Sequence, residues 1–477
     1  MDKTEGSNEK GASRVGLVMQ AIGARIAGRS LASGARLPSI RSLAESLGVS
    51  KSTVVEAYDR LAAEGVIQAR RGSGFYVAGH APPFSPADLG PRLERAVDPF
   101  WVSRQSLDAG AGALKPGCGW LPADWMPQDA LRRGLRLLSR AADATLADYG
   151  SPLGLAPLRQ VLARRLAVHG IEAAPDQIML TESGTQALDL VCSLLVEPGD
   201  TVLVDDPCYF NFHALLRAHR VRIVGVPYTA SGPDMAALEQ VLAQHRPRLY
   251  VTNSALHNPT GATLSPLVAH RVLKLADQFG LTIVEDDIFA DFEPEPSPRL
   301  SAFDGLQRVV QIGSFSKSLS ASVRCGYIAA RPDWIESLID LKIAASFGTG
   351  RLAAELVLSV LTDGSYRKHM DGLRVRLARA MGETSARLQA LGIRPWIEPR
   401  GGMFLWCELP EGQDASVIAR QLLSEGIVLA PGNVYSLSQT ADRFMRFNVA
   451  QSADPRLYSA LRHAMANGAH GGRATAE

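Results

Sequence analysis

The sequence predicts an α/β protein whose main body is preceded by a small helical unit and a linker. In the main body, short runs rich in β-branched residues alternate with longer stretches of helical periodicity. At the N-terminus, short helical patterns lead into a basic, glycine-rich turn, and a stretch rich in Pro, Ala and Gly separates the two parts. Strands that alternate with helices indicate a mainly parallel sheet covered on both faces.

Changes in composition divide the 477 residues into five segments. We expect a disordered tail over 1–12, a small helical unit over 13–80, a linker over 81–113, the α/β body over 114–467 and a frayed tail over 468–477. Within the linker, the region of Trp101 is suited to dock on a neighbouring surface. A chain of this length exceeds what one core usually organises, so more than one domain is expected.

Composition also restricts the compartment. Lys and Arg number 50 against 48 for Asp and Glu, which excludes a polycation but allows a local basic patch. The five cysteines are scattered without a C-x-x-C pair, so we expect neither a disulfide framework nor a metal site. The N-terminus is polar and no apolar run approaches the length of a membrane span. We expect a soluble, cytoplasmic protein.

Two short helices with clear ends lie in the N-terminal segment. Ser39 is placed to cap the first helix, on which Ile40, Leu43 and Leu47 share one face. Gly48 follows where a left-handed residue costs least. Ser50 caps the second helix, which turns these residues toward the core: Val54, Ala57, Tyr58 and Leu61. The residues left outward on its first turn are Lys51, Ser52 and Thr53. Two helices joined this closely form a helix-turn-helix, whose second helix enters the major groove of DNA.

A basic hairpin follows the helix-turn-helix. Gly65 ends the second helix, and VIQARRGSGFYV predicts two strands with Arg70, Arg71 and Gly72 at the tip, a wing able to reach DNA. Between Ser13 and His80 there are nine Arg or Lys residues and four acids. Contacts with phosphates supply most of the affinity for DNA, so this excess favours DNA binding. The alternative is a small helical protein-interaction module with a solvated basic face.

The N-terminal segment as a whole resembles the GntR-type winged helix. The resemblance implies an operator in double-stranded DNA as partner, contacted by these residues: Arg41, Ser50, Lys51, Ser52, Thr53, Arg70, Arg71 and Gly72. Val55 stands where some relatives of this type place a contacting Arg. Their base preference therefore does not transfer to this chain.

A lysine lies at a strand end in the α/β body. Lys317, in SFSKSLSASVRCGY, follows the strand RVVQIG, and open α/β sheets bind ligands at such ends. A lysine whose pKa is lowered by burial or a nearby cation can form a Schiff base with a carbonyl cofactor. Ser314, Ser316 and Arg324 surround it with groups suited to a phosphate. Alone, a lysine in a Ser-rich turn is more often merely solvated.

Other strand ends carry groups suited to the same ligand. Ser183, Gly184 and Thr185 begin a helix after QIML, where backbone N–H groups can bind a phosphate. Asp286 ends the strand of VEDDIF, where a carboxylate can pair with a pyridinium nitrogen. Each has a simpler alternative, a capped helix for the first and a capped turn for the second. Asn258 in HNPTG can bond a phenolic oxygen, and Tyr209 in DDPCYF can stack on a flat ring or be a core aromatic.

These motifs, in this order, resemble fold-type-I aminotransferases over residues 114–467, with a mainly parallel central sheet and a small C-terminal α+β subdomain. Joined to a GntR-type head, they resemble the MocR subfamily of regulators. The resemblance implies pyridoxal 5'-phosphate as cofactor, linked to Lys317, with Asp286 on the pyridine nitrogen, Asn258 on the ring oxygen and Tyr209 on the ring. The phosphate is held by these residues: Ser183, Gly184, Thr185, Ser314, Ser316 and Arg324.

The same resemblance implies a dimer and a bound amino compound. Tyr149 matches a tyrosine that reaches the partner subunit's phosphate. Arg446, in FMRFNV, matches the arginine that clamps an α-carboxylate, and RGGMFLW, from Arg400, borders that pocket. The family usually has Tyr three residues after Asp286, whereas this chain has Phe289. The ring oxygen thereby loses one donor.

The sequence therefore supports several functions. A DNA-binding regulator that senses an amino compound, or pyridoxal phosphate itself, explains both the winged helix and the cofactor site. An aminotransferase acting on an amino acid, with the head as an appendage, is the alternative. Phe289 argues against it, and we expect any transamination to be residual. A structural DNA-bridging protein would bind no cofactor.

Overall fold

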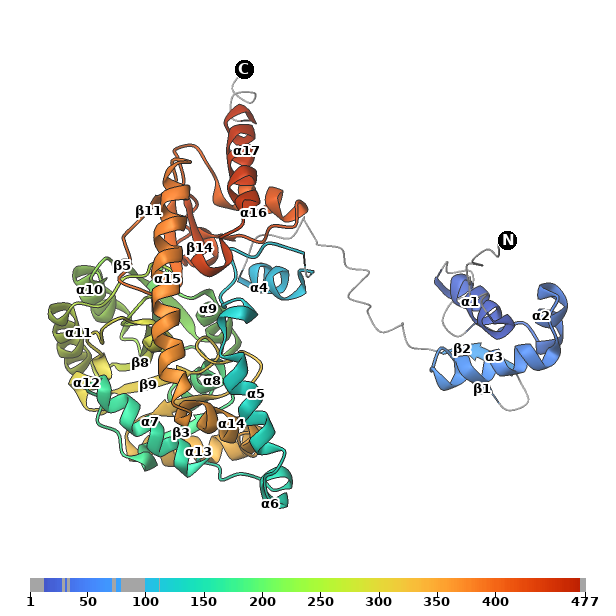
Figure 1. The fold of residues 1–477 in the computed structure, drawn as a ribbon, viewed down its shortest axis with the longest axis horizontal. Coiled ribbons are helices and arrows are strands. Elements are labelled where there is room, and N and C mark those ends of the chain that lie inside the picture. Colours follow the sequence, from blue (N-terminus) through green and yellow to red (C-terminus); the bar gives the residue numbers. More distant parts are fainter. Residues whose placement is uncertain are drawn as a thin grey trace, which may run out of the picture. The chain divides into compact units, whose positions relative to one another are not determined.

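In the computed structural model, the chain forms two compact units, Met1–Arg92 and Leu93–Glu477 (Figure 1). The structure describes residues 13–27, 31, 35–70, 74–78, 99–110 and 112–471. Within these ranges, no helix combines the length and the apolar character that crossing a membrane requires. All five cysteines are buried and carry free thiols.

The N-terminal unit contains the two capped helices that the sequence predicts. Its elements are α1 (Arg14–Ala27), α2 (Ile40–Leu47), α3 (Lys51–Ala63), β1 (Ile67–Arg70) and β2 (Gly74–Val77). Ser39 Oγ accepts from Ser42 N and Ser50 Oγ accepts from Thr53 N, both at 3.2 Å, which fixes the two N-termini. Gly48 ends α2 in the left-handed region, with φ 64°.

The core of this unit lies between α1 and α3. The predicted inward side of α3 is buried, and the Tyr58 hydroxyl donates to Pro38 O at 2.7 Å. Leu43 is buried, whereas Leu47, which the sequence predicts on the same face of α2, is 40% exposed. Leu47 is the last residue of the short α2, and the turn that holds Leu43 makes the contact with the core instead.

The wing is a hairpin with a third strand segment. β1 and β2 pair antiparallel, with Ile67 opposite Val77. Leu37 N donates to Phe75 O at 2.8 Å and Val77 N donates to Ala35 O at 2.9 Å, so the segment before α2 extends the wing. Arg71 and Gly72, expected at the tip, lie outside the described residues, as does the side chain of Arg70.

The C-terminal unit is built on an eight-stranded sheet of order β3-β10-β9-β8-β7-β4-β5-β6. Strands β9, β8, β7, β4 and β5 are parallel, while β10 runs antiparallel to both β9 and β3 and β6 pairs antiparallel at the edge. The bounds are β3 (Ile178–Thr181), β4 (Thr201–Asp206), β5 (Arg222–Thr229), β6 (Gly232–Pro233), β7 (Leu249–Thr252), β8 (Thr282–Asp286), β9 (Val309–Ser314) and β10 (Gly326–Ala329). The mainly parallel sheet expected from the sequence is confirmed.

Helices cover both faces of this sheet. Successive residues of a strand point to opposite faces, so neighbouring residues of β4 pack against different helices. Val204 packs toward α8 (Gly184–Leu195), α9 (Phe210–Ala218) and α13 (Pro332–Ser346). Leu203 packs toward α10 (Met235–His245), α11 (Pro266–Phe279) and α12 (Leu300–Asp304). Further helices are α5 (Gln128–Leu138), α6 (Asp143–Ala147), α7 (Ala156–Val168) and α14 (Arg351–Thr362), and the 3-10 turns are η2 (Ala123–Trp125), η3 (Pro175–Gln177), η4 (Ala290–Phe292), η5 (Gly432–Val434) and η6 (Val449–Gln451).

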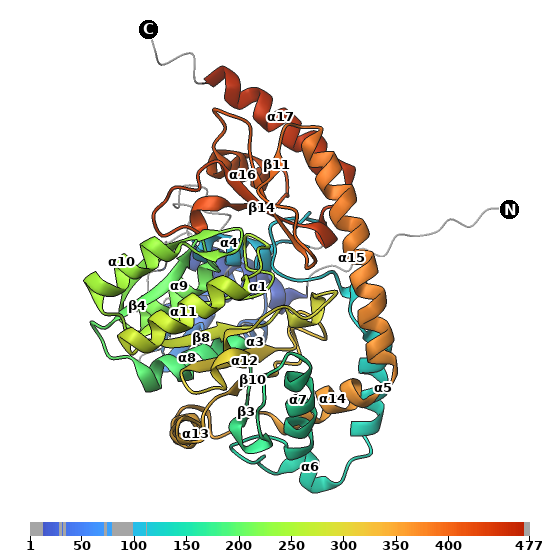
Figure 2. The same cartoon turned by 90° about the vertical axis from the view of Figure 1, so that its left-hand side faces the viewer.

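A smaller α+β subdomain follows the long helix α15 (Ser365–Gln389), which Figure 2 shows running from α14 toward α17. Its antiparallel sheet has the order β11-β12-β14-β13. Its elements are β11 (Arg394–Pro395), β12 (Phe404–Glu408), α16 (Ala415–Ser424), β13 (Ala430–Pro431), β14 (Phe444–Asn448) and α17 (Pro455–Gly471). The small C-terminal subdomain expected from the sequence is therefore confirmed.

The segment expected to be a linker is partly helical. Helix α4 (Pro99–Asp108) lies within 81–113, and its Trp101 and Val102 are buried in the core of the C-terminal unit. Two apolar side chains thus anchor a segment whose composition predicts a loop, in agreement with the docking expected at Trp101. Helix α17 also continues through Gly471, beyond the expected start of the tail at residue 468.

Candidate functional site

A cavity of about 180 Å³ lies where β7, β8 and β9 end and where α8 begins. Open α/β sheets form ligand crevices at this edge because the strand ends splay apart there. It is lined by the predicted residues Ser183, Gly184, Thr185, Tyr209, Asn258, Asp286, Ser314, Ser316, Lys317 and Arg324, and also by Gly119, Trp120, Leu188, Asn211, Phe212, Asn253, Ile288, Phe289 and Ala321. The structure therefore brings ten of the eleven predicted cofactor-binding residues into one cavity. Tyr149 does not line it, and neither does Arg446, the residue predicted to bind a ligand carboxylate.

One end of the cavity gathers groups that suit an anion. Ser183 caps α8, and the N–H groups of the first turn of a helix have no partner within the helix. The hydroxyls of Ser314 and Ser316 lie 3.0 Å apart beside them. A Cβ added at Gly184 would lie 3.7 Å from Ser314 Cβ, so the helix start and the strand end are in contact. Among the described residues, Arg324 has no ion-pair partner.

Lys317 lies three residues beyond β9 and its amine is buried. Nζ donates to Gly119 O at 2.6 Å. Burial, and then the nearby charge of Arg446, lower the pKa of Lys317 to about 8, because both disfavour the ammonium form. A lysine with this pKa supplies neutral, nucleophilic amine near neutral pH.

Asp286 is the last residue of β8, and its carboxyl group faces the same cavity. Oδ1 accepts from Ile288 N at 3.1 Å, and Asn253 Nδ2 donates to Asp286 O at 2.8 Å. Burial raises the pKa of Asp286 to about 6, against the opposing effect of these hydrogen bonds and of Lys317. The carboxylate is thus ionised at neutral pH and able to hold a protonated ring nitrogen.

Asn258 and Arg446 are hydrogen-bonded, although Asn258 lies in a turn after β7 of the large sheet and Arg446 lies on β14 of the small sheet. Arg446, on β14, is 1% exposed and donates from Nη1 to Asn258 Oδ1 and from Nη2 to Gly117 O, both at 2.8 Å. Its guanidinium carbon lies 4.1 Å from the Phe404 ring centroid. Phe404 belongs to the predicted stretch RGGMFLW, so this stretch does border the arginine. Arg400 itself is exposed.

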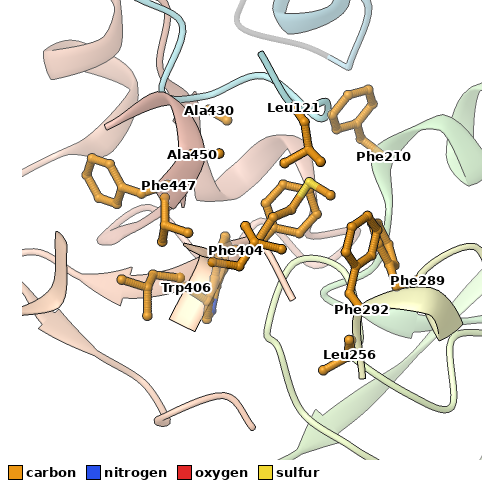
Figure 3. Close-up of a cluster of buried hydrophobic side chains, with 14 of the residues drawn as sticks. Leu121, Phe210, Leu256, Phe289, Phe292, Phe404, Trp406, Ala430, Phe447 and Ala450 are labelled. Carbon is orange, nitrogen blue, oxygen red and sulfur yellow. The ribbon is translucent and has the colours of Figure 1, made fainter. Parts of the chain in front are cut away.

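The aromatic residues of the site come from two segments. Tyr209 precedes α9 and packs edge-on against Phe212, with ring centroids 5.5 Å apart. Phe289 lies in the apolar cluster of Figure 3, where its ring meets that of Phe404 at 83° and 5.5 Å. Phe289 also lines the cavity.

Tyr149 is not brought to this cavity. Its side chain is 83% exposed and packs on Phe347, which is itself exposed, with ring centroids 5.3 Å apart. This position agrees with a role toward another subunit rather than within the same chain.

Sequence reasoning missed part of the cavity wall. Gly119 and Trp120 come from the start of the C-terminal unit, and Asn253 follows β7. Asn253 carried a usable signal, because it follows a buried strand just as Asp286 does. Gly119 carried no such signal, because it contributes a backbone carbonyl, which every residue has.

The predicted DNA-binding residues of α2 and α3 lie on the surface. Lys51 and Ser52 are exposed on the first turn of α3, and Arg41 is exposed with Glu45 Oε1 3.3 Å from its Nε. The Ser50 hydroxyl is engaged as the helix cap, within 2.8 Å of the hydroxyls of Ser52 and Thr53. Val55 is 39% exposed next to this surface.

The donors of the cavity fit pyridoxal phosphate. An anion site, a buried amine, a buried carboxylate and an amide next to an arginine match its phosphate, aldehyde carbon, ring nitrogen and ring oxygen. This match rests on the chemistry of the side chains and on their place in one cavity.

Two family models match the chain. Residues 16–77 match the bacterial regulatory proteins of the gntR family, and residues 122–463 match aminotransferase class I and II. The first range covers the helix-turn-helix and the hairpin. The second covers the cavity except Gly119 and Trp120, and domains of this class typically bind pyridoxal phosphate.

Curated relatives and solved structures agree with both matches. The uncharacterized HTH-type transcriptional regulator YdcR of Escherichia coli is 33% identical over 427 residues, 87% of this chain and 91% of that protein. The 2-aminoadipate transaminase of Thermus thermophilus is 32% identical over 342 residues, 70% of this chain and 84% of that enzyme. The crystal structure of LysN, an α-aminoadipate aminotransferase of Thermus thermophilus complexed with N-(5'-phosphopyridoxyl)-L-leucine, superposes with TM-score 0.71 at 26% identity and covers 81% of this chain and 99% of that one.

Proposed function

The chain belongs to the MocR type of GntR-family transcription regulators, in which a helix-turn-helix is fused to an aminotransferase class I and II domain, and we propose that its cofactor site senses an amino compound. The observation that carries this proposal is the joint presence, in one chain, of a surface suited to DNA and of a cavity in which Lys317, Asp286 and Asn258 meet. A ligand controls DNA binding only if it binds one DNA-competent arrangement better than another.

In this proposal the cavity residues hold pyridoxal phosphate in one orientation. The first turn of α8, Ser314, Ser316 and Arg324 bind the phosphate, while Tyr209 stacks on the ring. Asp286 keeps the ring nitrogen protonated, and Asn258 donates to the ring oxygen. When bound, the cofactor supplies an aldehyde carbon that the amine of Lys317, or the amine of a ligand, can attack.

The carboxylate of an amino compound is bound by Arg446. Its guanidinium is buried, always charged and held by Asn258 and Gly117, so its planar donors are oriented before a ligand arrives. The absence of a tyrosine hydroxyl at position 289, where this chain has Phe289, leaves these binding contacts in place and removes one donor from the cofactor's ring oxygen. Binding and slow chemistry suit a sensor better than rapid turnover does.

The regulator acts as a homodimer in the cytoplasm, where the operator DNA lies. Tyr149, Phe347, Leu352 and Leu146 are exposed at neighbouring positions around α6, α13 and α14. Arg351 Nη1 donates to Ala144 O at 3.2 Å and joins α14 to α6 within this surface. Exposed apolar patches of this kind mark protein interfaces. Tyr149 would then reach the phosphate site of the partner subunit.

Footprinting of the chain's own upstream region, with and without pyridoxal phosphate and a panel of amino acids, tests the proposal. We expect protection of one region whose extent or affinity changes with the ligand. Lys317→Ala should bind DNA and lose the ligand response. Identical protection under all conditions would contradict the sensing function.

An aminotransferase is the second candidate. The retained Lys317, Asp286, Asn258 and Arg446 favour it, as does the similarity to the Thermus thermophilus 2-aminoadipate transaminase. Steady-state conversion of an amino donor and a keto acid is the discriminating measurement. Sustained turnover combined with DNA binding that no amino compound alters would establish the enzyme instead of the sensor.

A further inference from the structure

We call residues 114–120, LKPGCGW, the strap. Leu114 bridges to Ile427, Pro116 and Gly117 form a turn, and Gly119 and Trp120 line the cavity. The strap is hydrogen-bonded to the C-terminal subdomain. Leu114 N donates to Gly426 O, and Gly117 N to Val428 O, both at 2.9 Å. A Cβ added at Gly117 would lie 2.5 Å from Ala430 N, so the strap lies flat against the chain that enters β13.

Two carbonyl groups of the strap accept hydrogen bonds from basic side chains of the site, Lys317 and Arg446. Lys317 Nζ donates to Gly119 O at 2.6 Å, and Arg446 Nη2 donates to Gly117 O at 2.8 Å. A Cβ added at Gly119 would lie 3.6 Å from Lys317 Nζ and 3.8 Å from Arg446 Nη2. The backbone of the strap therefore contacts both groups that change partners when a ligand enters.

The strap is also joined to the helix that precedes it. Lys115 Nζ donates to Ala109 O at 3.0 Å, directly after the end of α4, and Trp101 anchors α4 in the core. Helix α4 packs on α9, which starts after Tyr209. In the sequence, residues 79–98 connect α4 to the helix-turn-helix unit.

We propose that the strap transmits the occupancy of the site, read at Lys317 and Arg446, to α4 and so to the chain that leads to the DNA-binding unit. The proposal rests on the proposed sensing function and specifies its regulation. A free lysine ammonium has three N–H donors, whereas an amine that has condensed with an aldehyde, with loss of water, keeps at most one. Condensation therefore removes N–H donors that are available to Gly119 O, and release of Lys317 restores them.

A bound carboxylate acts on the second carbonyl. A carboxylate carries a full negative charge, so a ligand carboxylate competes with the neutral carbonyl of Gly117 for the guanidinium of Arg446 and displaces it. If an amino acid took the place of Lys317 on the cofactor, the freed amine of Lys317 would again donate to Gly119 O. The carboxylate of the same amino acid would take Arg446 away from Gly117 O. The strap shifts from one anchor to the other.

The test compares two Gly→Ala variants of the full-length protein. Gly117→Ala forces the strap off Leu429 and Ala430, while Gly112→Ala adds a Cβ with no atom within 4 Å and serves as the matched control. The affinity for a duplex from the chain's own upstream region is measured alone, with pyridoxal phosphate, and with pyridoxal phosphate plus each standard amino acid. Visible absorbance verifies that the cofactor is bound.

We expect the wild type and Gly112→Ala to change their DNA affinity at least tenfold with the most effective addition. Gly117→Ala should bind DNA and change less than twofold, and so should Lys115→Met, whose side chain bonds to Ala109 O and to neither Lys317 nor Arg446. If the wild type and Gly117→Ala responded equally, the proposed role of the strap would be wrong, but the sensing function would stand. A wild type that responds to nothing would overturn the sensing function on which it rests.

A second variant decides the matter if Gly117→Ala does not fold. Lys115→Met removes only the bond from the strap to Ala109 O, and we expect the same loss of response. Hydrogen exchange gives a readout independent of DNA. In the protein without cofactor, Lys317→Ala should speed hydrogen exchange of the strap amides, because Gly119 O loses its donor. Unchanged exchange of these amides would contradict the role of Lys317 in holding the strap.

Discussion

The guanidinium of Arg446, on the small sheet, donates over 2.8 Å to the side-chain oxygen of Asn258, in the turn that follows β7 of the large sheet. The residue proposed to bind a ligand carboxylate is thereby bonded to the residue proposed to bind the cofactor's ring oxygen. Each orients the other before any ligand is present, and this predicts a specific loss when the arginine changes.

Arg446→Lys should lower the affinity for amino acids at least tenfold, about 1.4 kcal/mol, because lysine cannot form the planar pair of donors. Spectral titration of the cofactor complex measures this. Arg443→Lys, three residues away and with Nη2 3.2 Å from Glu408 Oε1 on a half-exposed surface, is the control. Binding of an amine that lacks a carboxylate should be unchanged in both, and an equal loss for that amine would contradict the assigned contact.

Attachment of pyridoxal phosphate should accelerate as the pH rises through about 8, the lowered pKa of Lys317, because only the neutral amine attacks. With this pKa, about one tenth of the lysine is neutral at pH 7, against about one part in 3,000 for an ordinary lysine. Below about pH 6, protonation of Asp286 should weaken binding, since its pKa is raised and its charge is lost as the pH falls. Absorbance kinetics between pH 5 and 10 give both midpoints. An attachment midpoint near 10 would show that burial does not act on Lys317 as argued.

Phe289→Tyr should lower the pH midpoint of the visible absorption of the cofactor complex. A phenol in this place donates to the ring oxygen and stabilises its ionised form, by about 1 kcal/mol or somewhat less than one pH unit. Phe292→Tyr, in the same apolar cluster, does not line the cavity and is the comparison. An unchanged midpoint in Phe289→Tyr would mean that the missing hydroxyl is not the relevant departure.

Tyr58→Phe should destabilise the N-terminal unit by about 1 kcal/mol, because Pro38 O loses its buried donor. Hydrogen exchange of the α3 amides in the full-length protein should then be about fivefold faster. Tyr76 is a half-buried tyrosine of the wing. Tyr76→Phe tests whether removal of another tyrosine hydroxyl from this unit has the same effect. Similar acceleration in both would remove the special role of the bond to Pro38.

Lys51→Ala should reduce DNA affinity and lower the slope of log affinity against log salt by about 0.9, the value for one phosphate contact. Titrations at several salt concentrations measure the slope. Lys274→Ala, exposed on α11 of the other unit, removes the same charge away from the predicted surface. A reduced affinity with an unaltered slope would argue for a base contact in place of a phosphate contact.

Local chemistry explains which features could be read from the sequence. Ser39, Ser50 and Gly48 act on their own helix ends, so their types were informative without knowledge of the tertiary fold. The positions of Lys317 and Asp286 could be predicted by a second rule, that the carboxyl ends of parallel strands lie at the same edge of a sheet. Both rules link a residue type to a position close to it along the chain.

What remained hidden depends on contacts between distant segments. Helix α4 has the composition of a loop and is held by burial of Trp101, which only the folded core provides. Gly117 and Gly119 act through backbone carbonyls, and every residue has one, so no pattern of side chains marks them. Leu47 fits the apolar face of α2, yet its exposure is set by how far the neighbouring helices extend.

The chain between Ala78 and Pro99 limits how operator sites can be arranged. Ala78 ends the described part of the wing unit and Pro99 begins α4, which is fixed to the C-terminal unit by Trp101. Fully extended, the intervening residues span at most about 70 Å. In the proposed dimer, this length sets an upper limit on the distance between each helix-turn-helix unit and the α4 helix of the same chain, and so on the separation of the half-sites that one dimer can bind.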